Sequence, residues 1–538
     1  MKHPLLLTLV LTCALSTQTR AQASTDNPLI SHIPTGADKV YHINYISLSG
    51  KLDWKTLLAA LPKKPENQQF LSFLSDPASV GIDPRPGVIV AESNAFQLDS
   101  PRYTTILIAL TDSGKYLSYF MKAGDKSKFH ILPGKTRTAR QGDKTFFSWN
   151  DKLMVITTIK PPVSANPAVP GTDNTTYQFG PKVVASAMHR TIAAQKGFPT
   201  SRFLTDAAFR EAFADDADVH TWSRSGSGLG MMTDAMRLAK APINAEMLQT
   251  MKNMKQIHSQ SLTTISFGPG VIRVHNKIIY DSLQNFSFGS RPLNTDLIDR
   301  LPQGNLLGLV TLHIDPAGYL QMLQTMQGGK GMHSVDSMLA KKNLTADDIL
   351  SAFKGDALVA VLGNKAAPGD TSTKLPKPSI FVVLTINDQA KFTKVNNALH
   401  LTPDNRTEQD TPTSKPKMLA GHTLRDNILV LGSDQQAADD YFDKPGHAGT
   451  RLLSPELKAT PIALAIDVKA ISDYVAPSLK PKDQIVKVIL GLFDQITLAM
   501  ADLHGNQNNT TLEIKMTDQQ QNSLTTISQL VSSMSGGK

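Results

Sequence analysis

The sequence has very little cysteine and few aromatic residues. Cys13 is the only cysteine in 538 residues, and aromatic residues make up 6% of the chain, with three tryptophans. A chain that begins after residue 23 would contain no thiol, which excludes disulfides, thiol nucleophiles and cysteine metal sites. The scarcity of aromatic residues argues against a stacking surface for sugars or bases, and we expect no nucleic-acid partner.

Long hydrophobic runs are also absent. No stretch after the N-terminus approaches 18 consecutive apolar residues, so we expect no transmembrane segment. The N-terminus itself is typical of an export signal: Lys2 precedes the apolar run Leu5–Leu11, and Ala21-Gln22-Ala23 is a signal-peptidase site. The sequence predicts a signal peptide over residues 1–23 and export to the periplasm or cell surface. Lipid attachment at Cys13 is the less favoured alternative, because Thr12 replaces the usual small residue.

Familiar catalytic motifs are missing too. The sequence has no G-x-S-x-G elbow, no H-E-x-x-H helix and no Walker loop, and we predict neither a cofactor nor a metal. Ser351 and Lys354 have the Ser-x-x-Lys spacing, but its companion motifs are absent and chance explains it. A catalytic triad dispersed through the chain stays open, because triads are defined by geometry and not by spacing.

The chain is organised as one plan used twice. Leu29–Gly36 (LISHIPTG) returns as Leu297–Gly304 (LIDRLPQG), and each copy leads into an apolar, strand-like run. Strand and helix patterns then follow in the same order in both halves. We therefore predict two related tandem halves, residues 24–290 and 291–538.

Each half is expected to be α+β. The periodicities predict an antiparallel-rich sheet with helices on one face, and the ferredoxin-like βαββαβ order at the start of each half. Hairpins are expected to turn at Asn150-Asp151 and at Arg425-Asp426.

Five aspartates recur where a strand runs into a helix. This pattern could indicate catalysis or calcium, but an aspartate at a helix start also accepts hydrogen bonds from first-turn amides. We expect helix caps at Asp112, Asp315, Asp388, Asp434 and Asp467.

Two further segments carry polar residues or glycines. ADDADVH gathers Asp215, Asp216, Asp218 and His220, which could hold a divalent ion, although a solvated entry into a strand is the favoured interpretation. RSGSGLGMM (Arg224–Met232) lies between a strand and a helix, but its glycine spacing fits no phosphate-binding motif, and we favour a simple connection over an anion nest.

The positive charge is concentrated in the first half. Residues 24–290 contain 29 basic and 21 acidic residues, net +8, whereas residues 291–538 contain 24 and 25, net −1. Seven basic and two acidic residues fall within residues 122–144, net +5. This segment is the candidate anion-binding site, and a solvated loop is the alternative. Its basic residues are Lys122, Lys126, Lys128, Lys135, Arg137, Arg140 and Lys144.

The opening of the chain resembles a family of exported Bacteroidota proteins. The resemblance lies in IPTGADKVYHINYISLSGKLDW and FLSDPASVGIDPRPGVIV, with Ile33-Pro34, Ala37 and Gly81-Ile82-Asp83 as its short motifs. The family is known as domain of unknown function 4836. Because it has no established activity, the resemblance implies a compartment and an architecture, but no site residues.

These observations favour an exported, non-catalytic binding or scaffold protein of the periplasm or cell surface. Its partner would be an anionic envelope polymer or another envelope protein. The alternatives are an exported hydrolase with a dispersed catalytic site, and a binder of anionic envelope polymers through residues 122–144.

Overall fold

A computed structural model places the chain in two compact units. Unit 1 comprises Met1–Ile278 and Gln520–Lys538, and unit 2 comprises Ile279–Gln519. The structure describes residues 27–53, 75–95, 97, 100–123, 129–131, 137–162, 178–226, 258–281, 292, 294–318, 339–364, 377–402, 419–446, 452–479, 483–501 and 506–535.

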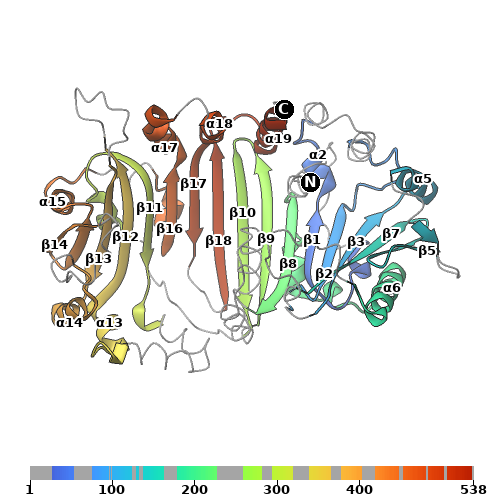
Figure 1. The fold of residues 1–538 in the computed structure, drawn as a ribbon, viewed down its shortest axis with the longest axis horizontal. Coiled ribbons are helices and arrows are strands. Elements are labelled where there is room, and N and C mark those ends of the chain that lie inside the picture. Colours follow the sequence, from blue (N-terminus) through green and yellow to red (C-terminus); the bar gives the residue numbers. More distant parts are fainter. Residues whose placement is uncertain are drawn as a thin grey trace. The chain divides into compact units, whose positions relative to one another are not determined.

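Unit 1 contains a sheet in which chain neighbours are mostly sheet neighbours (Figure 1). The order is β4-β5-β6-β7-β3-β2-β1-β8-β9-β10, and the pairs from β4 to β9 are antiparallel. The strands are β1 (Ala37–Ile43), β2 (Val88–Ser93), β3 (Arg102–Ala109), β4 (Phe129–Ile131), β5 (Arg137–Gln141), β6 (Thr145–Trp149), β7 (Leu153–Lys160), β8 (Val219–Gly226), β9 (His258–Gly268) and β10 (Val271–Tyr280). The helices of eight or more residues are α5 (Ser113–Ala123), α6 (Pro181–Lys196) and α19 (Ser523–Ser535), and the shorter ones include α2 (Tyr45–Ser49) and α7 (Ala207–Ala212).

Unit 2 contains a second antiparallel sheet. Its order is β14-β15-β13-β12-β11-β16-β17-β18 (Figure 1). The strands are β11 (Asn305–His313), β12 (Phe353–Gly363), β13 (Ser379–Ile386), β14 (Gly421–Arg425), β15 (Ile428–Gly432), β16 (Ile462–Asp467), β17 (Phe493–Met500) and β18 (Gln507–Met516). The helices are α10 (Thr295–Asp299), α13 (Ala346–Ala352), α14 (Gln389–Leu399), α15 (Gln435–Asp443), α16 (Pro455–Lys458), α17 (Val468–Val475) and α18 (Gln484–Leu492).

The α+β class expected from the sequence is confirmed, because helices accompany antiparallel sheets in both units. The ferredoxin-like order is not confirmed. In unit 1, β1 pairs with β2, β2 with β3 and β3 with β7, so these strands form a meander. Both expected hairpins are present, β6–β7 and β14–β15, but the second turns at Asp426-Asn427, one residue after the expected Arg425-Asp426. Asp426 and Asn427 have φ angles of 52° and 60°, as a two-residue hairpin turn that matches the strand twist requires.

Helices pack against both faces of each sheet, so the expectation of helices on one face is wrong. In unit 1, alternate residues of β6 point in opposite directions: Phe147 packs in the core with Tyr116 of α5, and Phe146 packs with Ala187 of α6. In unit 2, the same alternation on β15 sends Val430 to the core containing α15 and Leu429 to the core containing α14. The strands are apolar at successive positions because both sides are buried.

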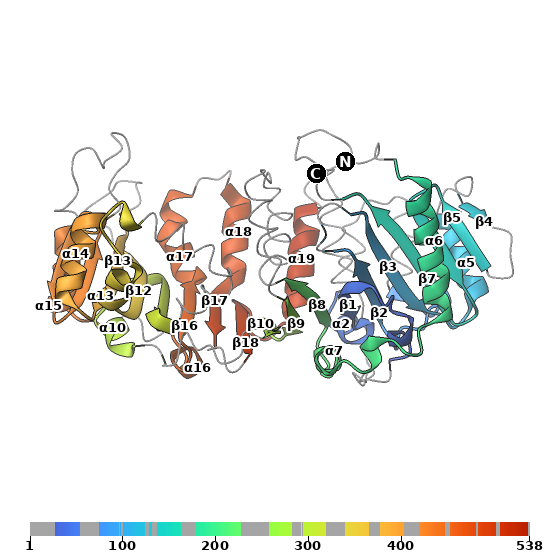
Figure 2. The same cartoon turned by 90° about the horizontal axis from the view of Figure 1, so that it is seen from below.

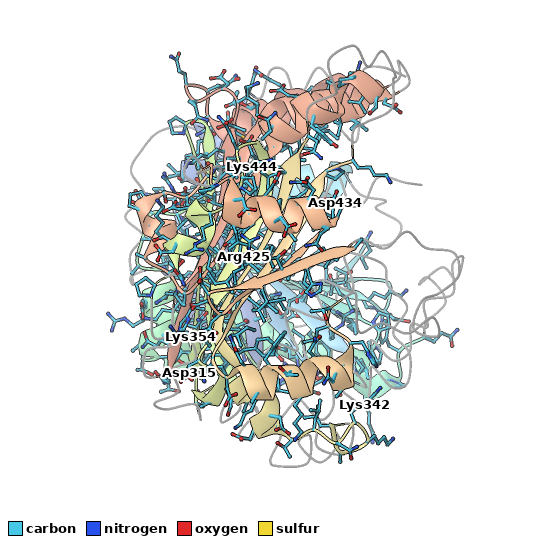
Figure 3. All side chains as sticks on the ribbon, turned by 90° about the vertical axis from the view of Figure 1, so that its left-hand side faces the viewer. Asp315, Lys342, Lys354, Arg425, Asp434 and Lys444 are labelled. Carbon is cyan, nitrogen blue, oxygen red and sulfur yellow. The ribbon has the colours of Figure 1, made fainter. Side chains whose placement is uncertain are left out.

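The five aspartates cap helices or first turns, as predicted. The backbone N–H groups that donate to their side chains lie two or three residues further along the chain. The donors are Lys115 to Asp112 (2.9 Å), Ala317 to Asp315 (3.1 Å), Lys391 to Asp388 (3.0 Å), Ala437 to Asp434 (2.8 Å) and Ala470 to Asp467 (2.7 Å). Figure 3 shows Asp434 beside α15. These side chains serve local structure.

The C-terminal segment differs from the predicted division of the chain. The predicted second half ended at residue 538, but Gln520–Lys538 belongs to unit 1. Side chains at the start of α19 bind backbone carbonyls of that unit: Ser523 Oγ donates to Val271 O (2.9 Å) and Thr525 Oγ1 to Lys51 O (2.6 Å). These contacts join residues that lie far apart in the sequence, so local sequence patterns could not reveal them.

Candidate functional site

The basic segment 122–144 is described only in part. Lys126, Lys128 and Lys135 lie outside the described residues, and Lys122 falls in α5. Arg137 and Arg140 are on β5, and Lys144 lies in the turn that follows.

The two described arginines of this segment already have acidic partners. Arg137 forms an ion pair with Asp151 (2.7 Å), and Arg140 pairs with Asp143 (3.5 Å). Asp151 comes from the β6–β7 turn, which the sequence analysis did not count with this segment. The local positive charge is therefore lower than the sequence count of +5 suggested.

The structure of the ADDADVH segment differs from the solvated strand entry that the sequence favoured. Asp216 is exposed, but the side chains of Asp218 and His220 are completely buried. A solvated strand entry is therefore wrong for Asp218 and His220. Their partners include His42 of β1 and Lys51, more than 160 positions earlier in the chain.

Asp218 is the centre of a buried polar cluster. Lys51 Nζ lies 2.7 Å from both carboxylate oxygens, and Ser47 Oγ donates to Oδ1 at 2.6 Å. The backbone N–H of Phe267 donates to Oδ2 at 2.6 Å. A carboxylate with this many donors is stable as a buried anion, and it holds β8, β9 and the segment around α2 together.

A hydrogen-bonded network of three side chains, His42, His220 and Asp215, lies next to this cluster. His42 of β1 is opposite His220 of β8, and their Nδ1 atoms are 3.2 Å apart. His220 Nε2 lies 2.7 Å from Asp215 Oδ1, and His42 Nε2 lies 3.0 Å from the carbonyl oxygen of Pro86. The ring of Phe213 stacks on His220, with centroids 5.6 Å apart.

The hydrogen-bond partners assign two protons of this network. The Pro86 carbonyl can only accept, so His42 Nε2 carries a proton. The hydrogen bond from His220 holds the pKa of Asp215 below its usual range, so Asp215 is the acceptor and His220 Nε2 is the donor.

His42 is the neutral member of the pair. Burial, which is the larger cause, and the nearby His220 together lower the pKa of His42 to about 4. His42 therefore accepts at Nδ1, and His220 is the donor in the bond between the rings. This buried hydrogen bond joins β1 to β8, while the side chain of Asp215, the other partner of His220, is 57% exposed.

Unit 2 has a simpler pair at the matching place on its first strand. His313 ends β11 and its Nδ1 lies 2.7 Å from Asp356 Oδ1, with both side chains buried. Thr385 Oγ1 donates to Asp356 Oδ2 at 3.3 Å. Each histidine is followed by isoleucine and then by a capping residue, Asn44 or Asp315. The partners of the histidine differ between the units, although its position on the strand does not.

Sequence reasoning missed His42, His313 and Asp356 as interacting residues. The only signal was the recurrence of His-Ile followed by Asn or Asp. Among the described residues, no group of three or more histidine, cysteine, aspartate or glutamate side chains could hold a metal ion. Ser351 and Lys354 fall on different elements, α13 and β12. The glycine loop lies outside the described residues beyond Gly226.

One sheet face differs between the units in the polarity of its side chains. The face of unit 2 that carries Val310 and Val359 has aliphatic side chains that are only partly covered. Val310 is 36% exposed and Val359 is 41% exposed. The corresponding face of unit 1 carries Lys39 paired with Glu92. In the described part of the chain, no helix is both long enough and apolar enough to cross a membrane.

Comparison with known proteins identifies no family. No protein-family model matches the chain, and no curated protein matches it. Three solved chains match, among them crystal forms III and IV of TP0453, each 8% identical with a TM-score of 0.26. These matches cover 52% and 53% of this chain and 87% and 90% of theirs. The likeness is too weak to carry an argument about fold or function.

Proposed function

We propose that this protein is an exported, non-catalytic binding or scaffold protein of the bacterial cell envelope, built from two related copies of one α+β domain. The export signal over residues 1–23 and the resemblance to domain of unknown function 4836 support the compartment. The lipid-anchored form through Cys13 is the alternative for how the protein is retained.

The two sheets support the duplication. Read from β6 to β10 and from β14 to β18, the strand orders correspond step for step: β6-β7-β3-β2-β1-β8-β9-β10 and β14-β15-β13-β12-β11-β16-β17-β18. Ile33 and Leu301, from the repeated LISHIPTG and LIDRLPQG segments, are both completely buried just before the first strand of their unit. His42 and His313 occupy the same place on those strands.

The observation that carries the binding role is the contrast between matching sheet faces. Copies of one fold need the same core, so a difference confined to a solvent-accessible face is not required by folding. Unit 2 exposes apolar side chains where unit 1 has paired polar ones. A partly uncovered apolar face is a feature of surfaces that bind a ligand or partner.

The test is a binding panel with recovery of the ligand. The chain from Ser24 is incubated with phospholipid vesicles, lipopolysaccharide, peptidoglycan and envelope glycans, and each bound component is analysed by mass spectrometry. We expect saturable binding of at least one component, recovered unchanged. Recovery of a cleaved component would favour the hydrolase alternative, and absence of binding to every component would refute the proposal.

Cell fractionation tests the compartment separately. The protein should appear in the periplasmic or surface fraction, with an N-terminus at Ser24. A cytoplasmic protein that keeps residues 1–23 would contradict export.

A further inference from the structure

A row of aliphatic side chains crosses the sheet of unit 2. Residues opposite one another on paired strands point to the same face, so successive pairings define a line of neighbours. The line follows the strand order β15-β13-β12-β11-β16-β17-β18. Its members are Leu431, Val382, Val359, Val310, Leu464, Leu498 and Leu512.

The rows on either side are also apolar. Leu312 pairs with Ile462 and Ile462 with Met500, and on the other side Ile466 pairs with Ile496. On β11, β16 and β17, the paired residues of this face include no charged side chain. Apart from Leu431, the row is only half-buried, and Val310 and Val359 are the most exposed.

The other face of β11, β12 and β16 is covered. Leu309, Leu358 and Ala463 belong to the core that includes α10 and α15. A strand that is apolar on both sides is expected where both sides are buried. Tyr474 of α17 lies against this face at the C-terminal end of β12, four residues along the strand from Val359, because a Cβ added to Gly363 would lie 2.9 Å from its ring. Figure 2 shows α17 and α18 on the same side of β16 and β17.

The matching row of unit 1 is polar at every position. His42 and His313 set the correspondence, since Lys39 and Val310 each lie three residues before the histidine. In strand order β7-β3-β2-β1-β8-β9, the row is Thr158, Thr104, Glu92, Lys39, Ser223 and Ser261. Glu92 accepts from Lys160 Nζ and Thr104 Oγ1, each at 3.4 Å. The fold therefore accommodates either chemistry, and the aliphatic row is specific to unit 2.

The length of the aliphatic row and its lack of charge indicate which kind of ligand would fit this face. Strands about 4.8 Å apart make the row from β13 to β18 about 24 Å long, most of which an extended acyl chain of about 16 to 18 carbons would cover. A face without charge complements hydrocarbon and offers nothing to a headgroup.

We propose that this face of unit 2 binds the acyl chain of a single lipid molecule, with its headgroup outside the aliphatic row. The inference rests on the proposed binding function and names its ligand class. Val310, Val359, Leu464 and Leu498 contact the acyl chain along its length. Tyr474 borders the row on the side where β12 ends, so the acyl chain lies across the strands beside this ring.

Binding is tested with a fluorescent palmitoyl lysophosphatidylcholine below its micelle concentration and the chain from Ser24. We expect saturable binding that the unlabelled lipid displaces. The double variant Val310→Thr, Val359→Thr keeps side-chain shape and strand preference but puts two hydroxyls against the acyl chain, and it should weaken binding roughly tenfold or more. The matched control Leu424→Thr changes an equally exposed residue on β14, three strands from Val359, and should leave the Kd within about twofold.

Site-directed labelling gives a second readout that does not depend on a polar substitution. Because Cys13 is the only cysteine, Val359→Cys in the chain from Ser24 creates a single thiol. The lysolipid should slow maleimide labelling at this position and leave labelling of Leu424→Cys unchanged. Equal protection at both positions, or at neither, would overturn the proposal.

The remaining outcomes separate the inference from the proposed function. If the lysolipid does not bind but another component of the envelope panel does, the acyl-chain inference is wrong and the binding function stands. If nothing binds, both are wrong. If the unmodified chain dimerises at assay concentrations and the double variant does not, the face is an interface between two copies and the lipid proposal is overturned.

Discussion

Replacing His42 with glutamine should remove much of the acid sensitivity of unit 1. Burial, together with the nearby His220, lowers the pKa of His42 from 6.5 to about 4. As the pH falls from about 6.5 to 4, the unfolded chain takes up a proton at this imidazole and the folded chain does not. Stability is therefore full above 6.5 and is lost progressively down to 4. At about 1.4 kcal/mol per pKa unit, the loss is about 3 kcal/mol.

The structure gives the physical reason for this loss. A proton added at His42 Nδ1 would face the Nδ1–H of His220, so the hydrogen bond between the rings would break. Glutamine can still donate to the Pro86 carbonyl and accept from His220, but it does not titrate. The variant therefore removes the titration while retaining the hydrogen-bonding groups.

Tryptophan fluorescence provides an assay that reports on unit 1. Trp54, Trp149 and Trp222 all lie in Met1–Ile278. Urea unfolding is followed at pH values from 7 to 4 for the unmodified chain and for His42→Gln. The difference in unfolding free energy between the two should change by about 3 kcal/mol over this range.

A control histidine distinguishes this effect from a general one. His189 is exposed on α6, and His189→Gln should follow the unmodified chain at every pH. If the unmodified chain and His42→Gln lost stability in parallel from pH 7 to 4, the assignment of His42 as the neutral, proton-excluding member of the pair would be refuted.

Three further predictions concern single contacts. Asp218→Ala should destabilise unit 1 by about 3–5 kcal/mol in urea unfolding, because it leaves Lys51 and a backbone N–H without their buried acceptor, and a loss below 1 kcal/mol would contradict this role. Asp434→Ala should cost unit 2 about 1 kcal/mol in thermal unfolding followed by circular dichroism, as expected for the loss of an N-cap. Reversing Arg137 and Arg140 to glutamate should change elution from heparin only slightly, because both arginines are already paired. A large fall in the eluting salt concentration would restore residues 122–144 as an anion-binding site.

Local features of this fold were accessible from the sequence. The capping aspartates and the two hairpins depend on contacts within a few residues, so each leaves a recognisable pattern in the chain. The helix α6 was not anticipated, and this omission accounts for the incorrect expectation of helices on one sheet face. Apolar residues at successive positions of β6 and β15 already indicated burial on both sides.

The remaining features depend on which strands become neighbours. The sequence by itself determined the α+β class and the helix caps, because periodicity and capping are short-range. Only the tertiary structure decided that His42 meets His220, and that Val310 and Val359 continue one aliphatic row. Strand register brings together residues separated by tens to hundreds of positions, and it is set by the packing of the whole sheet.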